Sequence, residues 1–370
     1  MEPHEPVAVS VLTGFLGAGK TTLLNRLLRD PALANTAVIV NEFGEVSIDH
    51  LLVEQASDGA IQLADGCLCC TVRGELVDTL ADLLDRAQTG RIARLDRIVI
   101  ETTGLADPVP VLQALMSHPV LAHELRLDGV IAVVDAVHGA GTLDRHEEAL
   151  RQAAVADRIV LTKTDLPEAR TDALRARLAA LNPRAPVVEA VSEASATAAA
   201  LFDAGLWNPA TKSADVVRWL GEAAQHDHDH DDHHHDHHHH HAHGVHDERV
   251  RSFSLVHDAA VAWNSIEMFL DLLRATQGER VLRMKGVVQV VEDPDRPLVL
   301  HGVQGMLHPP AWLANWPEGP RGTRLVLIGY DLDEDYVRRL FAGFMGQVAV
   351  DTPDKAALAG NPLAVPGFTH

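Results

Sequence analysis

Basic residues and long apolar runs are scarce in this chain of 370 residues. It has 31 Lys and Arg against 52 Asp and Glu, a formal net charge of −21, so it repels nucleic-acid phosphates and we expect no nucleic-acid partner. No apolar run is long enough for a membrane-spanning helix, which predicts no membrane contact. Residues 1–5 are acidic, unlike a secretory signal. We therefore expect a cytoplasmic protein whose acidity favours solubility or attraction for cations.

Cysteine is also scarce, because the chain has only three, all within Cys67-Leu68-Cys69-Cys70. An odd, clustered set in a cytoplasmic protein argues against a disulfide framework. Thiolates bind Zn²⁺ tightly, and Zn²⁺ prefers four tetrahedral ligands. Structural zinc sites are closed, so three thiolates from one short loop predict an open site, completed by a distant side chain, a water or a partner's ligand. A redox thiol pair is the alternative, whereas three inert thiols in four residues could not all face one core.

The chain does contain a glycine loop, Gly14-Phe15-Leu16-Gly17-Ala18-Gly19-Lys20-Thr21-Thr22, which fits G-x-x-x-x-G-K-[ST]. A buried strand is predicted over residues 7–12 before it and a helix over 23–28 after it. Loop N–H groups and the helix N-terminus would then face a phosphate chain. Lys20 would reach the β- and γ-phosphates, and the Thr21 hydroxyl would bind Mg²⁺. A glycine turn that only packs the helix is the alternative. The predicted nucleotide contacts of the loop are Gly14, Gly17, Ala18, Gly19, Lys20, Thr21 and Thr22.

Apolar runs that alternate with helical patterns continue along the first part of the chain. Repeated strand–helix units predict an α/β domain of the P-loop NTPase type, with a mostly parallel sheet and helices on both faces. We place this domain at residues 1–224. Beyond the first strand, the predicted elements are strands at 36–41, 95–100, 129–134, 157–161 and 186–191 and a helix at 72–87.

Two acidic segments follow predicted strands. Residues 42–49 lie where nucleotide hydrolases place a mobile switch, so Glu42, Glu45 and Asp49 are candidates to contact Mg²⁺, a second metal or the attacking water. Solvated loop carboxylates are the alternative for each. Glu101 directly follows the strand predicted at 95–100, and Gly104 follows it by three residues, as expected where a P-loop hydrolase senses the γ-phosphate and holds Mg²⁺ through water. The predicted catalytic residues are Lys20, Thr21, Glu42 and Glu101, with Gly104 as a nucleotide contact.

The base is predicted by Thr162-Lys163-Thr164-Asp165, which resembles the Asn-Lys-x-Asp signature of guanine-nucleotide binders. Asp165 could accept hydrogen bonds from guanine N1–H and its exocyclic amine, whereas adenine offers no such donor pair. The stem of Lys163 would lie along the base. Thr162 replaces the usual asparagine, and whether it still tethers this motif to the glycine loop is open. A simple lysine–aspartate turn before Pro167 is the alternative.

Residues 225–247 form a low-complexity segment with thirteen histidines and six interleaved aspartates. Such a composition cannot bury a core, which predicts a flexible linker. Its imidazoles are mostly neutral at pH 7 and hence ready metal ligands. A solubilising spacer is the alternative; an expression tag is disfavoured by the internal position and the broken runs.

A second, smaller α+β domain is predicted over residues 248–350, followed by a disordered tail at 351–370. No catalytic constellation is present in it, and His257, His301 and His308 are expected to be ordinary core or surface histidines. The predicted elements are strands at 250–256, 281–291, 297–303 and 324–328 and helices at 265–275 and 333–344.

Taken together, these motifs resemble the CobW-type metallochaperone GTPases, a branch of the P-loop GTPases related to HypB and UreG. The resemblance rests on the glycine loop, the segment 41–49, the Cys-x-Cys-Cys motif, residues 101–108 and the base motif, and includes the histidine-rich linker. In the second domain it rests on Lys285-Gly286 and His301-Gly302-Val303-Gln304. It implies a zinc chaperone with GTPase activity that uses GTP, Mg²⁺ and Zn²⁺ and hands its metal to a client metalloprotein.

The resemblance further implies that Cys67, Cys69 and Cys70 hold the metal and that GTP binding orders the site. We expect Glu45 or His118 as the fourth ligand and slow unassisted turnover, because no glutamine or arginine finger is evident. In several members the second domain serves dimerisation or client recognition, and both roles, a homodimer included, stay open for this chain. A Co²⁺ chaperone for cobalamin synthesis and a zinc store with regulatory nucleotide binding remain alternatives.

Overall fold

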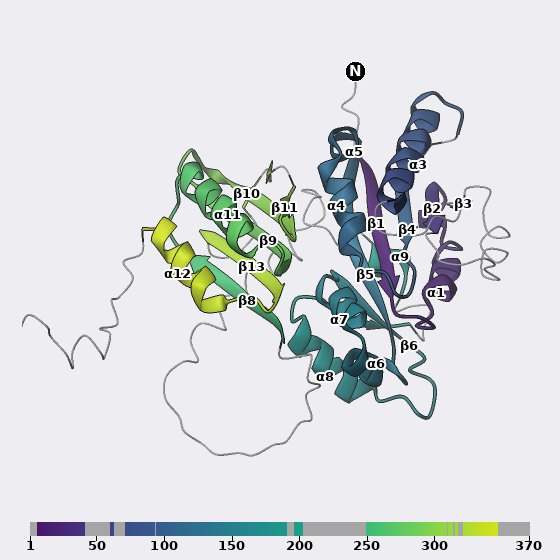
Figure 1. Ribbon diagram of the computed structural model, residues 1–370. Coiled ribbons are helices and arrows are strands. Elements are labelled where there is room, and N and C mark those ends of the chain that lie inside the picture. Colours follow the sequence, from purple (N-terminus) through teal and green to yellow (C-terminus); the bar gives the residue numbers. More distant parts are fainter. Residues whose placement is uncertain are drawn as a thin grey trace, which may run out of the picture.

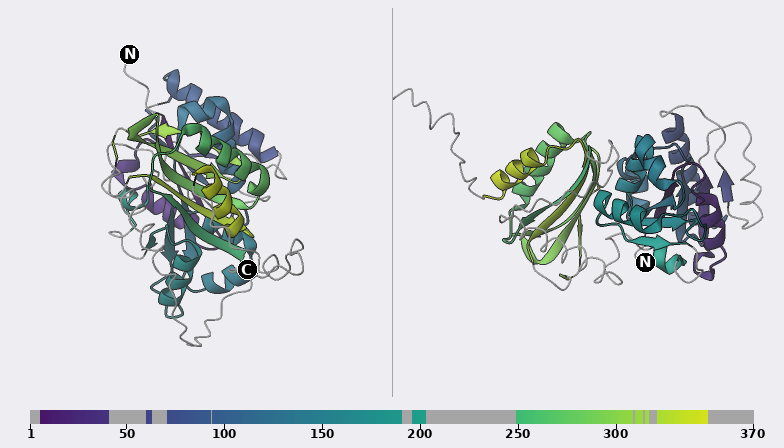
Figure 2. Two further views of the ribbon diagram at one scale, coloured as in Figure 1. Left: turned by 90° about the vertical axis from the view of Figure 1, so that its left-hand side faces the viewer. Right: turned by 90° about the horizontal axis from the view of Figure 1, so that it is seen from below.

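The computed structural model describes residues 6–40, 60–62, 71–92, 94–190, 196–202, 249–308, 310–313, 315–316 and 321–346. The expected metal motif at 67–70, the segment 42–49, the histidine-rich segment 225–247 and the tail 351–370 lie outside the described residues, as do the predicted domain limits. Within the described residues, two sheets lie side by side, each with its own helices (Figure 1, Figure 2).

The first sheet has seven strands in the order β3-β2-β4-β1-β5-β6-β7, and every neighbouring pair is parallel. This confirms the predicted α/β fold. Its strands are β1 (Val7–Gly14), β2 (Thr36–Val40), β3 (Ala60–Gln62), β4 (Arg97–Glu101), β5 (Leu125–Asp135), β6 (Arg158–Thr162) and β7 (Val187–Glu189). Its helices are α1 (Lys20–Leu27), a 3-10 turn η1 (Pro31–Leu33), α3 (Thr71–Gln88), α4 (Val109–Ser117), α5 (Pro119–Glu124), α6 (Gly139–Arg145), α7 (Glu147–Ala154), α8 (Thr171–Leu181) and α9 (Ala198–Leu201).

Helices cover both faces of this sheet, which explains why its strands read as continuous apolar runs. On β1, Val9 and Val11 belong to the buried cluster that includes α3, α4, α7 and α8, whereas Leu12 belongs to the cluster with α1 and α9. Strand β5 begins four residues earlier than the sequence predicts, at Leu125, where it pairs with Val7. The sequence pattern missed this part of the strand because it contains the polar Asp128. That side chain is nevertheless buried and accepts a hydrogen bond from Ser10.

The second sheet is antiparallel, with six strands in the order β11-β10-β9-β13-β8 and β12 paired to β10. Its strands are β8 (Val250–His257), β9 (Val281–Val290), β10 (Asp293–Val303), β11 (Met306–Leu307), β12 (Ala311–Trp312) and β13 (Thr323–Tyr330), and its helices are α11 (Trp263–Gln277) and α12 (Glu334–Phe344). This confirms the α+β expectation. Strand β10 begins four residues before the predicted Pro297, because Asp293 pairs with Val290 across a hairpin.

The two helices of the second domain cover one face of its sheet, and the other face packs against α4, α7 and α8 of the first domain (Figure 1, Figure 2). Leu282, Val303 and Ile328 from this face belong to the same buried cluster as the core of the first domain. Buried apolar residues of the two domains therefore form one cluster between the sheets.

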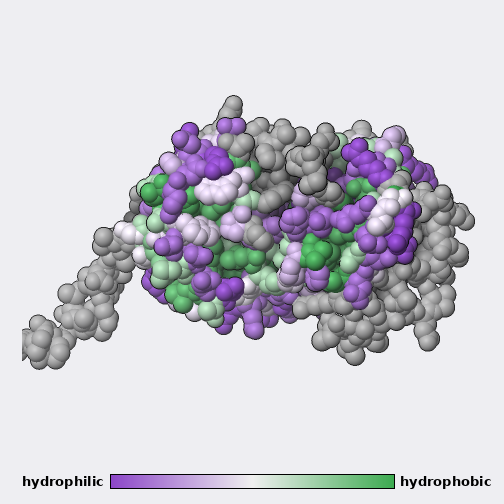
Figure 3. Space-filling view, turned by 90° about the horizontal axis from the view of Figure 1, so that it is seen from above, coloured by the Kyte–Doolittle hydropathy of each residue, from purple (hydrophilic) through white to green (hydrophobic). Residues whose placement is uncertain are grey.

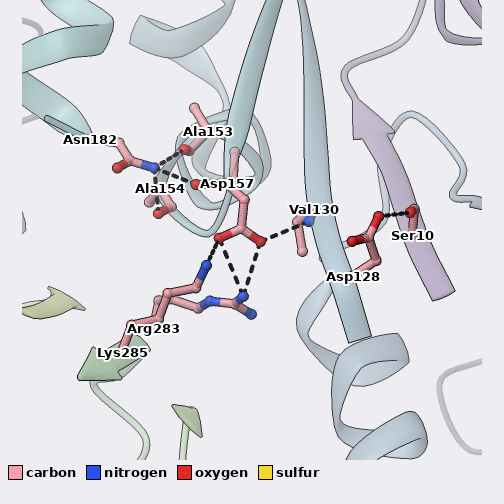
Figure 4. A network of polar contacts seen from close by, with 10 residues as sticks. Ser10, Asp128, Val130, Ala153, Ala154, Asp157, Asn182, Arg283 and Lys285 are labelled. Atoms are coloured by element: carbon pink, nitrogen blue, oxygen red, sulfur yellow. Dashed lines mark hydrogen bonds and ion pairs between the residues drawn. The ribbon is translucent and has the colours of Figure 1, made fainter. Parts of the chain in front are cut away.

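A buried ion cluster lies within this interface (Figure 4). The Asp157 side chain, just before β6, is 6% exposed and pairs with Arg283 and Lys285 of β9. Its carboxylate also accepts a hydrogen bond from Val130 N at 2.9 Å. Arg283 and Lys285 hold the pKa of Asp157 far below its usual value, although burial alone would raise it. The carboxylate is thus charged at neutral pH and holds two cations of the second domain.

Seen from above, hydrophilic residues are spread over the described surface of both domains, and hydrophobic residues form small separate patches (Figure 3). Among the described residues, no helix is both long enough and apolar enough to span a membrane.

Candidate functional site

The glycine loop turns sharply between the end of β1 and the start of α1. Gly14 and Gly19 have φ angles of +143° and +96°, which L side chains rarely adopt. A Cβ on Gly14 would lie 2.3 Å from Val133 O of the neighbouring strand. Lys20 is buried, and its Nζ donates to Gly14 O at 3.0 Å, so the ammonium lies over the loop. The strand–loop–helix context that the motif requires is therefore present.

A hydroxyl and a carboxylate meet beside this loop. Thr21 Oγ1, in the first turn of α1, donates to Glu101 Oε1 at 2.7 Å. Glu101 is 4% exposed and ends β4, where it pairs with Leu12 of β1. An oxygen pair of this kind fits Mg²⁺, which takes one or two protein oxygens and completes its shell with phosphate and water. The structure thus brings together two residues that the sequence predicted as magnesium contacts. Thr22 directly follows Thr21 in α1.

The loop between β4 and α4 (residues 102–108, the β4–α4 loop) packs directly on the glycine loop. A Cβ on Gly104 would lie 2.6 Å from Leu16 N, so only glycine allows this approach. Gln152 of α7, which is 1% exposed, fixes this loop by two hydrogen bonds. Its Nε2 donates to Gly104 O at 3.3 Å and to Ala106 O at 3.0 Å. Gln152 is a site residue that the sequence did not reveal, because α7 lies about fifty residues downstream of the loop that it holds.

The base motif lies on the other side of the glycine loop. Thr162 Oγ1 donates to Ala18 O at 2.6 Å, so the hydroxyl provides the tether that was open at the sequence level. Lys163, with a positive φ of 56°, donates from Nζ to Gly17 O at 2.9 Å and to Asp135 Oδ2 at 2.6 Å. Asp165 is exposed beyond them. The structure therefore brings Thr162 and Lys163 onto the loop, as the predicted guanine motif requires.

Asp135, at the end of β5, was not predicted as a site residue. Burial acts to raise its pKa, but hydrogen bonds from Lys163, Val137 N and His138 N outweigh it and hold the pKa below its usual value. The resulting carboxylate fixes the ammonium of Lys163 against the glycine loop. A strand-end aspartate in Val133-Val134-Asp135 was the only signal in the sequence.

A cavity of about 140 Å³ lies beside the glycine loop on the side of α6 and α7. Phe15, Gly17, Asp135, Gln152 and Lys163 are among its lining residues, whereas Thr21 and Glu101 are not. It is thus next to the base motif and separate from the predicted magnesium contacts.

The predicted metal ligands are only partly placed. Cys67, Cys69, Cys70, Glu42 and Glu45 lie outside the described residues. His118 lies between α4 and α5, where its Nδ1 accepts a hydrogen bond from Leu121 N at 3.4 Å. Its role as a fourth ligand stays a prediction. In the part of the chain that the structure describes, no group of three or more His, Cys, Asp or Glu could hold a metal ion.

Comparisons with known proteins agree with this geometry. Residues 8–189 match the protein-family model of the CobW/HypB/UreG nucleotide-binding domain. Residues 250–345 match the family model of the cobalamin synthesis protein cobW C-terminal domain. The chain is 37% identical over 341 residues to zinc chaperone YjiA of Escherichia coli, covering 91% of this chain and 98% of that protein. It is 32% identical over 371 residues to zinc chaperone CobW of Sinorhizobium sp, covering 90% and 95%.

The crystal structure of Zn(II)-bound YjiA GTPase from E. coli aligns with a TM-score of 0.64 at 32% identity and covers 92% of this chain and 99% of that one. Both domains are thus included in the similarity. The chain belongs to the CobW/HypB/UreG family and carries the CobW-type C-terminal domain.

Proposed function

We propose that this protein is a GTP-hydrolysing metallochaperone that binds Zn²⁺ at Cys67, Cys69 and Cys70 and transfers it to a client metalloprotein. The observation that carries the nucleotide part is the hydrogen bond from Thr162 Oγ1 to Ala18 O, which ties the base motif to the glycine loop. Support for the metal part comes from the thiolate set and from relatives named as zinc chaperones.

Each residue has its own task in the proposed reaction. Lys20 binds the β- and γ-phosphates, and the loop N–H groups orient them. Thr21 would hold Mg²⁺ directly and Glu101 through water, and the ion supplies charge neutralisation at the transferred phosphoryl group. Asp165 accepts hydrogen bonds from guanine, and Asp135 keeps Lys163 in place along the base. Without an activating partner, we expect turnover on the order of 10⁻³ s⁻¹.

The metal cycle is proposed to follow the nucleotide. The segment 42–49 and the Cys-x-Cys-Cys motif follow β2 and β3 in the sequence. Parallel sheets of this kind bind ligands at the carboxyl ends of their strands. Contacts of Glu42 with Mg²⁺–GTP would order the first segment, and Glu45 or His118 would complete the thiolate site. Hydrolysis would remove those contacts and release the metal.

The experiment is metal titration of the chain without residues 225–246, loaded with Mg²⁺ and either a non-hydrolysable GTP analogue or GDP. We expect one tight Zn²⁺ site, lost in Cys69→Ala and weaker with GDP. Cys69→Ala should bind both nucleotides like the wild type, which shows that its loss of Zn²⁺ is local. Equal zinc affinity in the two nucleotide states would contradict the coupling.

The histidine-rich segment 225–247 favours a second candidate, a zinc store in which nucleotide only regulates release. The same deletion separates the two: a store loses most of its capacity, whereas a chaperone keeps its thiolate site. Titration with Co²⁺ tests the cobalt alternative, because thiolate and imidazole ligands do not by themselves select Co²⁺ over Zn²⁺.

A further inference from the structure

One aromatic side chain of the second domain is buried in the core of the first. Tyr330, the last residue of β13, is 7% exposed and belongs to the buried cluster formed mainly by the first domain. Two guanidinium groups face its ring: the Arg249 carbon Cζ lies 4.3 Å from the ring centroid and that of Arg151 lies 5.2 Å from it. Arg249 belongs to the second domain and Arg151 to α7 of the first, so the ring joins the two domains.

Arg151 has a second set of contacts inside the first domain. One of its NH groups donates to Asp107 Oδ2 at 3.2 Å. Its Nε and other NH group donate to Glu147 Oε1 at 3.1 and 2.7 Å, which fixes the plane of the guanidinium. A single half-buried cation therefore links Tyr330 to Asp107.

Asp107 belongs to the β4–α4 loop and fixes how the chain leaves it. Its Oδ1 accepts a hydrogen bond from Val109 N at 2.9 Å, at the start of α4. The same loop contains Gly104, which contacts the glycine loop, and Gln152 holds its carbonyl groups. Two successive residues of α7, 151 and 152, thus hold the β4–α4 loop, and the first of them also contacts the second domain.

The helix that follows the loop makes its own contact with the second domain. Gln113 Nε2 of α4 donates to Gln304 Oε1, between β10 and β11, at 2.8 Å. The β4–α4 loop is therefore connected to the second domain in two ways. One connection runs through Arg151, and the other runs through α4, the helix that follows the loop.

We propose that Arg151 is a positioning residue through which Tyr330 of the second domain holds the β4–α4 loop in the arrangement that favours GTP over GDP. This inference rests on the proposed GTPase function. The two nucleotides differ only in the γ-phosphate, and the Gly104 region is predicted to face it together with Lys20. A contact that fixes this loop changes the affinity for GTP more than that for GDP, and the coupling acts equally in both directions.

The test compares equilibrium affinities for GDP and for a non-hydrolysable GTP analogue, with Mg²⁺, in the full chain. The variants are Arg151→Met, Tyr330→Leu, the double variant, and Arg151→Lys, which keeps the cation but not the planar fork. We expect each single loss to weaken the GTP analogue about fivefold with unchanged GDP affinity. The double variant should be no worse than the single ones, since both remove one link, and Arg151→Lys should restore part of the preference.

Arg184→Met is the matched control. It removes another hydrogen bond between the domains, to Ser254 Oγ, from the segment between α8 and β7, and should keep the wild-type preference. If Arg151→Met unfolds, Asp107→Asn replaces it: the amide oxygen can still cap α4, while the ion pair is lost. Equal losses for both nucleotides, or an unchanged preference, would overturn the inference. Failure of the wild type to bind either guanine nucleotide would instead refute the proposed function.

Discussion

At the scale of single residues, Thr162 shows how a departure from a motif can keep the motif's task. Its hydroxyl donates to Ala18 O over 2.6 Å, where guanine-nucleotide binders of this type carry asparagine. We predict that Thr162→Val, which loses the donor but keeps the shape, weakens GDP and GTP binding about tenfold, as expected for a loss near 1.4 kcal/mol. Calorimetric titration measures this, with Thr162→Ser as the control that retains the hydroxyl. Wild-type affinity in Thr162→Val would show that the tether does not matter.

Base selection is a second residue-scale prediction. Asp165→Asn exchanges a pair of acceptor oxygens for one acceptor oxygen and one donor amide group. The new amide group would face a donor of guanine, and that donor of guanine would be left unpaired. Affinity for GTP should fall strongly, by up to about 10⁴-fold, whereas affinity for XTP, whose base presents a carbonyl there, should rise. Competition binding with GTP, XTP and ATP measures both changes. A variant with unaltered preference for guanine would mean that Asp165 does not read the base.

The residues predicted from the sequence are those in local motifs: Lys20, Thr21 and Glu101 lie together as their motifs require. Gln152 and Arg151 could not be predicted, because each acts on a loop more than forty residues away in the chain. Their spacing on α7 carries no local signature. Only the packing of α7 beside the β4–α4 loop gives them a role.

At the scale of elements, β6 has a structural contact at one end and the base motif at the other. Asp157 precedes it and pairs with Arg283 and Lys285 in a site where the side chains are 6%, 6% and 14% exposed. Asp157→Ala would leave both cations without their carboxylate, and breaking a buried pair in this way costs roughly 3–5 kcal/mol. Urea unfolding of the full chain measures the loss.

The control for this variant is Asp271→Ala, which removes an exposed partner of Arg274 on α11. Exposed pairs contribute roughly 0–1 kcal/mol, so this variant should unfold almost like the wild type. Similar losses in both variants would show that burial does not strengthen the Asp157 cluster.

Elements with a clear period were predicted well, and their ends less well. Strand β10 extends back to Asp293 through a segment with four charged or proline residues, because hairpin pairing with β9 outweighs their low strand propensity. Strand β5 extends back to Leu125 for a similar reason, since its polar residues are satisfied by neighbouring strands.

At the scale of the whole molecule, two domains were expected from length and composition, but not the faces that join them. An apolar residue of β9 or β13 is equally suited to cover a helix of its own domain or of the other. The structure uses both: Leu327 packs in the second core, and Ile328 packs in the cluster shared with the first domain. The apolar pattern alone therefore could not predict which residues join the two domains.

His301 lies at that interface and is expected to make it sensitive to pH. Its Nε2 is buried and makes no hydrogen bond within the described residues. Burial lowers its pKa well below 6.5, and the cations Lys285 and Arg283 add to the effect, His308 slightly so, while Asp157 opposes it. The neutral ring is the folded form, and the unfolded chain takes up the proton first. Stability from His301 is thus complete above about pH 6.5 and is lost as pH falls from there toward its folded pKa.

We therefore predict that His301→Leu flattens the pH dependence of unfolding. In the wild type, one such proton lowers the free energy of unfolding by up to about 1.4 kcal/mol per pH unit below pH 6.5. The leucine variant removes this component, so its loss between pH 7 and pH 5 should be smaller by that order. His123→Leu, at a side chain 86% exposed, is the matched control and should follow the wild-type slope. Parallel curves for wild type and His301→Leu would show that the interface does not exclude the proton, and the domains would then be expected to stay docked in mild acid.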